Sequence, residues 1–137
     1  MSKLLLDTNV LMYAMDGQSR YHASAVAILT DPTYEMAVST KVVSEFFAVC
    51  SKLKIPLGDA QNFYREVKGN VEILFPDAAS LCHFEELIQT YQPRGNRVFD
   101  LEIVSVAMAN GISEIATANL SDFQEVTEIE VVPLIAE

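Results

Sequence analysis

Short apolar runs alternate along the chain with longer segments in which apolar residues recur at helical spacing. The short runs predict five buried strands, over Leu4–Leu6, Met36–Val38, Val71–Phe75, Ile115–Thr117 and Glu130–Val132. The longer segments predict helices over residues 10–14, 21–29, 39–50, 58–68, 78–91 and 98–109. Because strands and helices alternate with short connections, we expect an α/β fold with a mainly parallel sheet and helices on both faces.

Polar side chains follow several of these strands. Asp7 ends the first strand, Glu45 lies about a turn and a half into the helix after the second, and Asp100 is near the start of the last long helix. Asn119 and Asp122 follow the fourth strand. Ligands of parallel sheets bind outside the carboxyl ends of the strands, at the point where the strand order reverses. These residues are therefore the candidates for a functional site.

An ionised carboxylate among apolar neighbours is costly unless it is paired or bound to a metal. Too few basic residues lie near these acids in the sequence to pair them all. Converging carboxylates without thiolate or imidazole partners suit Mg²⁺ or Mn²⁺ rather than Zn²⁺. The pattern indicates a site for a divalent cation that could act on a phosphodiester bond.

Each acid also has a simpler structural explanation. Asp7 could cap the helix that follows it, although Thr8 or Asn9 is the N-cap that we expect there. Asp100 could be an acid favoured by the helix dipole. Glu45 lies on an otherwise apolar helix face and is harder to explain in this way. Four acidic residues at strand ends together favour a site.

Composition bounds the class of protein. With 137 residues, half of them hydrophobic, we expect one domain spanning residues 1–137. The chain has 19 acidic and 9 basic residues, a net charge of −10, which on average argues against nucleic-acid binding. The acids are concentrated late, however, since residues 98–137 contain 8 acidic and no basic side chains. The basic residues gather in 41–68 and at Arg94 and Arg97.

Among these basic residues, we take Lys41, Arg94 and Arg97 as candidates for contacts with an RNA backbone. An ordinary solvated surface is the alternative, and we favour it for Lys52 and Lys54.

The sequence also bounds the cellular compartment. Cys50 and Cys82 lie in apolar surroundings without the spacing of metal ligands, which predicts buried, reduced thiols. The first residues lack a signal-peptide core, and no run approaches the ~18 apolar residues that span a bilayer. We expect a cytoplasmic protein with no membrane partner.

Four segments carry a family resemblance: Leu5–Leu11, Ser39–Phe47, Phe99–Val104 and Thr117–Phe123. With these segments, the sequence resembles PIN-domain nucleases, in particular the VapC-like ribonuclease toxins of type II toxin–antitoxin systems. The resemblance spans almost the whole chain, and all four segments occur in the family order at suitable spacing.

The resemblance implies a three-layer α/β/α architecture with a central, mainly parallel sheet of four or five strands. It implies Mg²⁺- or Mn²⁺-dependent hydrolysis of RNA that leaves 5′-phosphate and 3′-hydroxyl ends. Asp7, Glu45 and Asp100 match the three core acids of the family. Many members have Asp where this chain has Asn119; whether Asn119 fills the fourth position with a neutral oxygen or Asp122 supplies the fourth charge is open, as is the choice between one metal and two.

Further expectations concern supporting residues and partners. Thr8, Asn9 and Thr117, together with Asn119, are candidates for hydrogen bonds that hold the carboxylates in place. The resemblance implies a cognate antitoxin protein, which in this family lays a peptide over the acidic groove, and a homodimer. An acidic groove without an internal neutralising charge is compatible with such a partner.

Two other functions compete with an RNA endonuclease. A degenerate PIN-like module would bind RNA or protein without cleaving it; Asn119 favours this alternative, and the intact Asp7, Glu45 and Asp100 count against it. A phosphatase or receiver domain is disfavoured, because the segment after Asp7 lacks a second Asp and no Lys follows a late strand.

Overall fold

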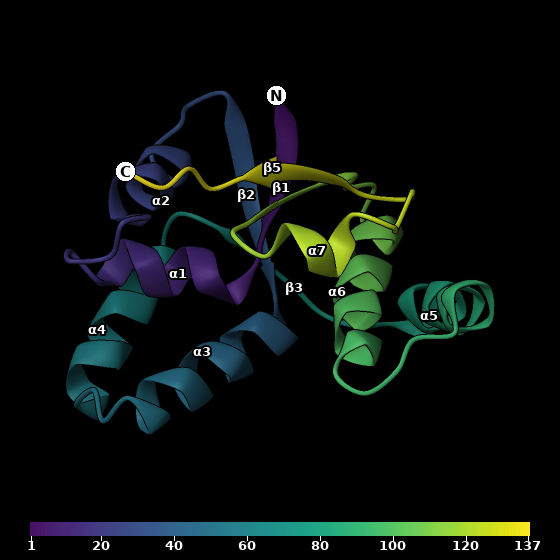
Figure 1. Cartoon of the computed structure of the whole chain (residues 1–137), viewed down its shortest axis with the longest axis horizontal. Helices are drawn as coiled ribbons and strands as arrows, with labels where there is room; N and C mark the ends of the chain where they lie inside the picture. Colours follow the sequence, from purple (N-terminus) through teal and green to yellow (C-terminus); the bar gives the residue numbers. More distant parts are fainter.

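A computed structural model describes all 137 residues, which form an α/β fold (Figure 1). The elements follow in the order β1 (Ser2–Leu6), α1 (Thr8–Met15), α2 (His22–Leu29), β2 (Tyr34–Ser39), α3 (Thr40–Lys52), α4 (Leu57–Lys68), β3 (Glu72–Leu74), α5 (Ala78–Tyr91), α6 (Arg97–Ala109), β4 (Glu114–Thr117), α7 (Leu120–Phe123) and β5 (Glu130–Pro133). None of these helices has the length and apolar character needed to cross a bilayer.

The five strands form one parallel sheet in the order β3-β2-β1-β4-β5. The chain moves outward from β1 to β3 and then returns to place β4 on the other side of β1. Because crossovers between parallel strands are right-handed, this reversal moves the later helices to the opposite face. Figure 1 shows α1 to α4 on one side of the strands and α5 and α6 on the other. The predicted three-layer arrangement is confirmed.

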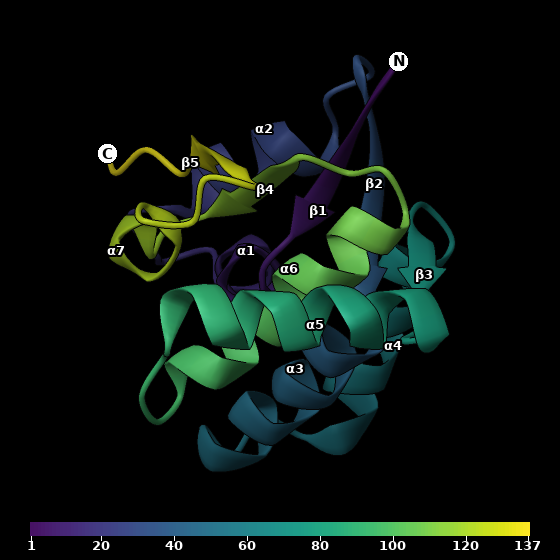
Figure 2. The same ribbon diagram turned by 90° about the vertical axis from the view of Figure 1, so that its right-hand side faces the viewer.

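Seen from the α5 side, the strands lie side by side behind α6, and α5 is outermost (Figure 2). The central strand β1 is enclosed by both helical layers, so Leu4, Leu5 and Leu6 are completely buried. This explains why the strand is a continuous apolar run with no polar alternation. On α3, the fully buried Phe46 stacks on Phe63 of α4 at a centroid distance of 5.8 Å and fixes the helix against the core.

Three details differ from the sequence predictions. Asp7, not Thr8 or Asn9, is the N-cap of α1, and its Oδ1 accepts a hydrogen bond from the Thr8 amide at 2.8 Å. The helix α7 was not predicted, because four residues are too few to show helical spacing. Cys50 is buried as predicted, but Cys82, which lies on the outermost helix α5, is exposed.

Candidate active site

The chain reversal in the sheet lies between β1 and β4, the neighbouring strands that lead to Asp7 and Thr117. The Asp7 amide donates a hydrogen bond to the Ala116 carbonyl at 3.0 Å, so the two strands run side by side to their carboxyl ends. The segments that follow then diverge, β1 into α1 and β4 toward α7. Such a divergence is where ligands of parallel α/β sheets bind.

Asp7 is held rigidly at this position. Its Oδ2 accepts hydrogen bonds from Thr117 Oγ1 at 2.8 Å and from Asn9 Nδ2 at 3.1 Å. Its Oδ1 accepts the capping hydrogen bond from Thr8, and the residue is only 7% exposed. Asn9 also joins the two strand ends, because its Oδ1 accepts a hydrogen bond from the Ala118 amide at 3.0 Å. Thr8, Asn9 and Thr117 thus provide the support that the sequence predicted.

Glu45 reaches the same place from α3. The helix begins at the end of β2 with Ser39 as its N-cap, and the buried Phe46 fixes its rotation. Glu45 is half-buried, and its Oε2 accepts a hydrogen bond from Thr8 Oγ1 at 2.8 Å. This hydrogen bond between Thr8 and Glu45 links α1 directly to α3 beside Asp7.

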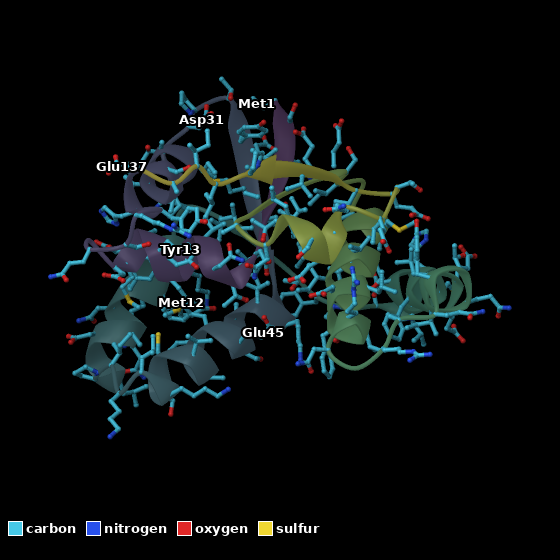
Figure 3. The ribbon with its side chains drawn as sticks, viewed as in Figure 1. Met1, Met12, Tyr13, Asp31, Glu45 and Glu137 are labelled. Atoms are coloured by element: carbon cyan, nitrogen blue, oxygen red, sulfur yellow. The ribbon has the colours of Figure 1, made fainter.

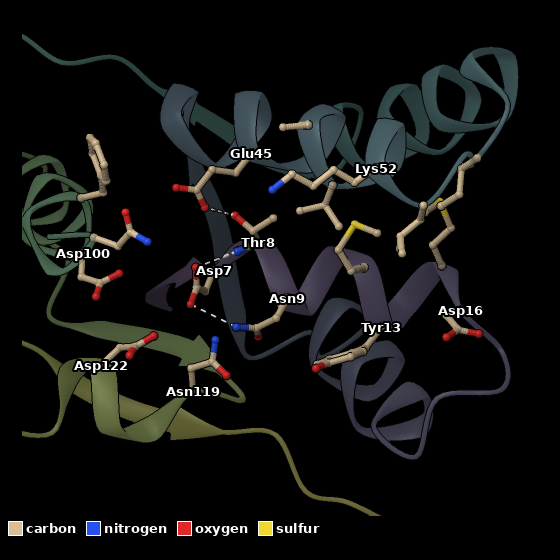
Figure 4. A pocket seen from close by; sticks show the side chains of 18 of the residues that line it. Asp7, Thr8, Asn9, Tyr13, Asp16, Glu45, Lys52, Asp100, Asn119 and Asp122 are labelled. Atoms are coloured by element: carbon tan, nitrogen blue, oxygen red, sulfur yellow. Dashed lines mark hydrogen bonds between the residues drawn. The ribbon is translucent and has the colours of Figure 1, made fainter.

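Asp100 and Asp122 come from the opposite side, on α6 and α7. Arg97 ties these two helices together, because its Nη2 donates to the Ser121 carbonyl at 3.0 Å. Figure 4 shows the carboxylates of Asp7, Glu45, Asp100 and Asp122 around one common space. The structure therefore brings together all four acids that the sequence predicted.

Asn119 lies beside this cluster and is exposed. The backbone amide of Asn119 donates a hydrogen bond to Thr117 Oγ1 at 3.0 Å. Asn119 is also the N-cap residue of α7, but its side chain makes no capping hydrogen bond. The helical turn that follows carries Asp122 back toward Asp7. Asn119 is thus a neutral residue at the edge of the cluster, and the four acids carry its charge.

The acids occupy one end of a groove of about 1090 Å³. The other end lies between α1, α3 and the start of α4 and is lined largely by apolar side chains: Met12, Met15, Val49, Leu53, Ile55 and Pro56. Figure 3 shows Met12 on the side of α1 that faces α3 and α4. The groove is thus acidic at the sheet edge and apolar beyond it.

One basic side chain, Lys52, lines this groove among six acidic ones. In Figure 4 its ammonium group extends along α3 toward Glu45. We expected Lys52 to belong to an ordinary solvated surface. Its position on the same helix face as Glu45 could have been predicted from their spacing of seven residues, which is two helical turns.

The three predicted RNA-contacting residues lie outside the lining of this groove. Arg94 and Arg97 line a neighbouring depression that also contains Asp122. Lys41 lies over the ring of Phe99.

The acids in the cluster are unpaired. Lys3 and Glu72, far from the groove on β1 and β3, form the one ion pair in the chain, at 3.7 Å. Burial, together with the charges of Asp122, Asp7 and Glu45, raises the pKa of Asp100 to about 7, against a smaller lowering effect of Arg97. Burial also raises the pKa of Asp7, although its hydrogen bonds from Thr117 and Thr8 oppose the shift. The cluster therefore holds mutually repelling charges that a cation would offset.

The donor set fits Mg²⁺ or Mn²⁺, because it consists of carboxylate oxygens without sulfur or imidazole. In the conformation described, no three acidic, His or Cys side chains stand close enough to enclose one ion. Asp7 is fixed by three hydrogen bonds, whereas Glu45, Asp100 and Asp122 are half-buried and reach the groove from separate helices. Closure on an ion would therefore come from these three side chains, with Asp7 as the fixed ligand.

The raised pKa of Asp100 predicts an unusual pH dependence of stability. An unfolded Asp titrates near ~3.9, so the folded chain binds this proton more tightly, and its stability falls as the pH rises from about 4 to about 7. In metal-free buffer, Asp100→Asn should raise the midpoint of thermal unfolding more at pH 8 than at pH 5. Glu125→Gln, at an exposed position, is the control and should shift the midpoint equally at both values. A pH-independent effect of Asp100→Asn would contradict the repulsion described above.

The fold is similar to several solved structures. A VapBC2 complex from Rickettsia felis bound to a promoter DNA fragment aligns with a TM-score of 0.76 and 21% identity, over 96% of this chain and 98% of that chain. A toxin–antitoxin complex from Klebsiella pneumoniae aligns with a TM-score of 0.73 and 20% identity, over 98% and 99%. VapC20 of Mycobacterium tuberculosis, described as a toxin that cleaves the sarcin–ricin loop, gives 0.64 and 15%, over 82% and 86%.

Sequence comparison gives a sharper result than these structural similarities. Comparison with curated protein sequences finds no match. The model of the PIN domain, by contrast, matches residues 4–129, which include every residue of the acidic cluster. The chain therefore belongs to the PIN domain family.

Proposed function

We propose that this protein is a divalent-metal-dependent endoribonuclease that hydrolyses phosphodiester bonds in RNA. The observation that carries the proposal is the group of four unpaired carboxylates, Asp7, Glu45, Asp100 and Asp122, in one groove at the chain reversal of the sheet. Membership of the PIN domain family supports it. So does the structural similarity to VapC20, which is described as a toxin that cleaves the sarcin–ricin loop.

Each acid has a role that its surroundings favour. Asp7, Asp100 and Asp122 would hold the cation or cations, because they come from both sides of the groove and Asp7 is fixed by its hydrogen bonds. When bound, Mg²⁺ or Mn²⁺ lowers the pKa of a coordinated water and offsets negative charge on a phosphodiester. Thr8 donates a hydrogen bond to Oε2 of Glu45, which leaves Oε1 either to bind the metal or to orient a water molecule toward the phosphate.

Removal of divalent cations tests this proposal. The purified chain should cleave labelled single-stranded RNA in Mg²⁺ or Mn²⁺, lose that activity in excess EDTA and regain it when the metal is restored. Cleavage at an unchanged rate in EDTA would contradict the carboxylate mechanism. RNA binding is expected to be weak, because few basic residues lie near the groove to bind phosphates, and it is expected to be salt-sensitive, because each such contact releases a counterion from the RNA. RNA binding without cleavage in either metal would instead support a PIN-like module without nuclease activity.

We further propose that the protein is the toxin of a toxin–antitoxin pair in the cytoplasm. Two of the similar structures are described as complexes of such pairs. The groove fits a basic peptide with apolar side chains, because it is apolar at one end and lined by six acidic residues and Lys52. The product of an adjacent small gene, mixed in equimolar amount, should inhibit cleavage; an unchanged rate would contradict this pairing.

The resemblance to VapC-like toxins also leads us to propose a homodimer. Sedimentation equilibrium should give twice the chain mass of 15.2 kDa. A monomer at all micromolar concentrations would contradict this proposal.

A further inference from the structure

Phe99 is an aromatic residue that the core does not account for. It directly precedes Asp100 on α6, lines the groove and is 43% exposed. The aromatic residues of α3 and α4 behave differently, because Phe46, Phe47 and Phe63 pack against one another or against Tyr64. Phe99 has no such aromatic partner and presents a flat apolar surface beside the acidic cluster.

The partner of Phe99 is a cation on α3, outside the lining of the groove. Lys41 lies one turn before Glu45, and its Nζ is 4.0 Å from the centroid of the Phe99 ring. Lys41 forms no ion pair. The contact therefore joins α3 and α6 beside the groove, and the positive charge of Lys41 has no carboxylate partner.

An aromatic ring and a cation in contact can bind the two parts of a nucleotide, its base and its phosphate. Stacking on an aromatic ring binds any base of a single strand, because every base has a π face. An ammonium group binds a phosphate and releases the cation condensed on it. A cation–π contact at an exposed site adds little to the stability of a fold. Stabilising the contact between α3 and α6 is therefore a weak explanation for the pairing of Lys41 with Phe99.

We propose that Phe99 and Lys41 form a nucleotide subsite that positions single-stranded RNA beside the carboxylates, with a base stacked on the face of the ring that Lys41 does not cover and a phosphate at the ammonium group. This inference rests on the proposed function, since it supplies the substrate contact that the acidic groove lacks. The subsite places the strand by its bases without selecting their identity. Phe99 and Lys41 are positioning residues, and Asp7, Glu45, Asp100 and Asp122 remain the reacting centre.

The test is a cycle of two changes, one in the protein and one in the RNA. The background is Asp7→Asn, which prevents cleavage, in Mg²⁺ buffer. The probes are fluorescein-labelled hexauridylate and the same ribose-phosphate chain without bases, with binding measured by fluorescence anisotropy. Phe99→Leu keeps an apolar side chain but removes the flat ring. It should weaken binding of hexauridylate about tenfold and leave binding of the baseless chain unchanged.

Phe99→Tyr should restore the binding of hexauridylate, because it restores the ring. The subsite is overturned if Phe99→Leu weakens the binding of both probes by the same factor, or if it weakens the binding of neither. It is also overturned if the Asp7→Asn protein binds hexauridylate no more tightly than it binds the ribose-phosphate chain without bases. A purely structural role of Phe99 would give the first of these results, together with a lower midpoint of thermal unfolding.

Lys41 is tested by salt dependence. Lys41→Gln should reduce the slope of log affinity against log salt concentration by about 0.7 for hexauridylate, the value for one phosphate contact on a single strand. Lys68→Gln, at the exposed end of α4, is the matched control and should leave the slope unchanged. An unchanged slope in Lys41→Gln would overturn the phosphate contact.

Cleavage of RNA by the unaltered chain is measured separately, so that the two proposals fail in different ways. Ring-dependent binding without cleavage would refute the nuclease and leave the subsite. Cleavage without ring-dependent binding would refute the subsite and leave the nuclease.

Discussion

Replacing Asp7 by Asn is expected to lower the rate of RNA cleavage by more than ~100-fold. Changes to residues that merely support a metal ligand reduce activity or metal affinity by about 10–100-fold, so loss of the ligand's charge should exceed that range. Asp7 is the acid whose position is most tightly fixed, with hydrogen bonds from Thr8, Asn9 and Thr117. The measurement is the initial rate on labelled RNA in saturating Mg²⁺.

The Asp7→Asn chain should remain folded. The pKa of Asp7 is raised in the folded state by burial and by the charges of Glu45 and Asp122. Loss of the Asp7 charge therefore relieves an unfavourable interaction at neutral pH. Asn retains an oxygen that can accept the capping hydrogen bond from the Thr8 amide. Circular dichroism checks the fold. A folded Asp7→Asn chain with more than a tenth of the normal rate would contradict the assigned role.

Replacing Thr117 by Val is expected to lower cleavage about 10–100-fold and to raise the Mg²⁺ concentration needed for half-maximal rate. The Thr117 hydroxyl is completely buried between the two strand ends. It donates to Asp7 Oδ2 at 2.8 Å and accepts from Asn9 Nδ2 and from the Asn119 amide, both at 3.0 Å. Val has a similar shape but no hydroxyl, so all three hydrogen bonds are lost while the packing is kept.

The matched control is Thr117→Ser, which keeps the hydroxyl and removes the methyl group. It should retain most of the rate and the normal Mg²⁺ requirement. Equal losses in the Ser and Val variants would show that packing at this position, and not the orientation of Asp7, limits the activity.

Much of the site could be predicted because its main members follow from short-range patterns. Leu4–Leu6 is a continuous apolar run that ends at Asp7, and Thr117 ends a second such strand. Parallel strands bring their carboxyl ends to one edge, so residues more than a hundred positions apart meet there, as Thr117 and Asp7 do. Glu45 stood out because it interrupts an apolar helical face.

Features that depend on side-chain direction or on tertiary packing could not be predicted in this way. Asp7 caps α1 because Thr8 turns its hydroxyl toward Glu45, a contact between residues 37 positions apart. Lys52 lines the groove because α3 and α1 diverge from the sheet edge, which fixes the face that α3 presents. Phe99 lies in an apolar helix that the sequence predicts to be buried, but it belongs to the side of α6 that lines the groove and is 43% exposed.

The structure also changes the meaning of the net charge of −10. Burial, together with the repulsion among four acids in a single groove, raises the pKa of Asp7 and raises that of Asp100 to about 7. A site of this kind lowers the stability of the metal-free chain, and a bound cation would relieve it. The acidity therefore does not exclude RNA, because a bound cation and a few local basic residues would supply the positive charge at the point of contact.

The chemical nature of the RNA ends tests the central claim most directly. In the proposed mechanism, attack by a water molecule that Glu45 orients would break the bond to the 3′ oxygen and would leave a 5′-phosphate on one fragment and a 3′-hydroxyl on the other. Mass spectrometry of fragments made by the purified chain in Mg²⁺ should show these ends alone. Fragments ending in a 2′,3′-cyclic phosphate would mean attack by the RNA's own 2′-hydroxyl, and would contradict hydrolysis by the carboxylate cluster.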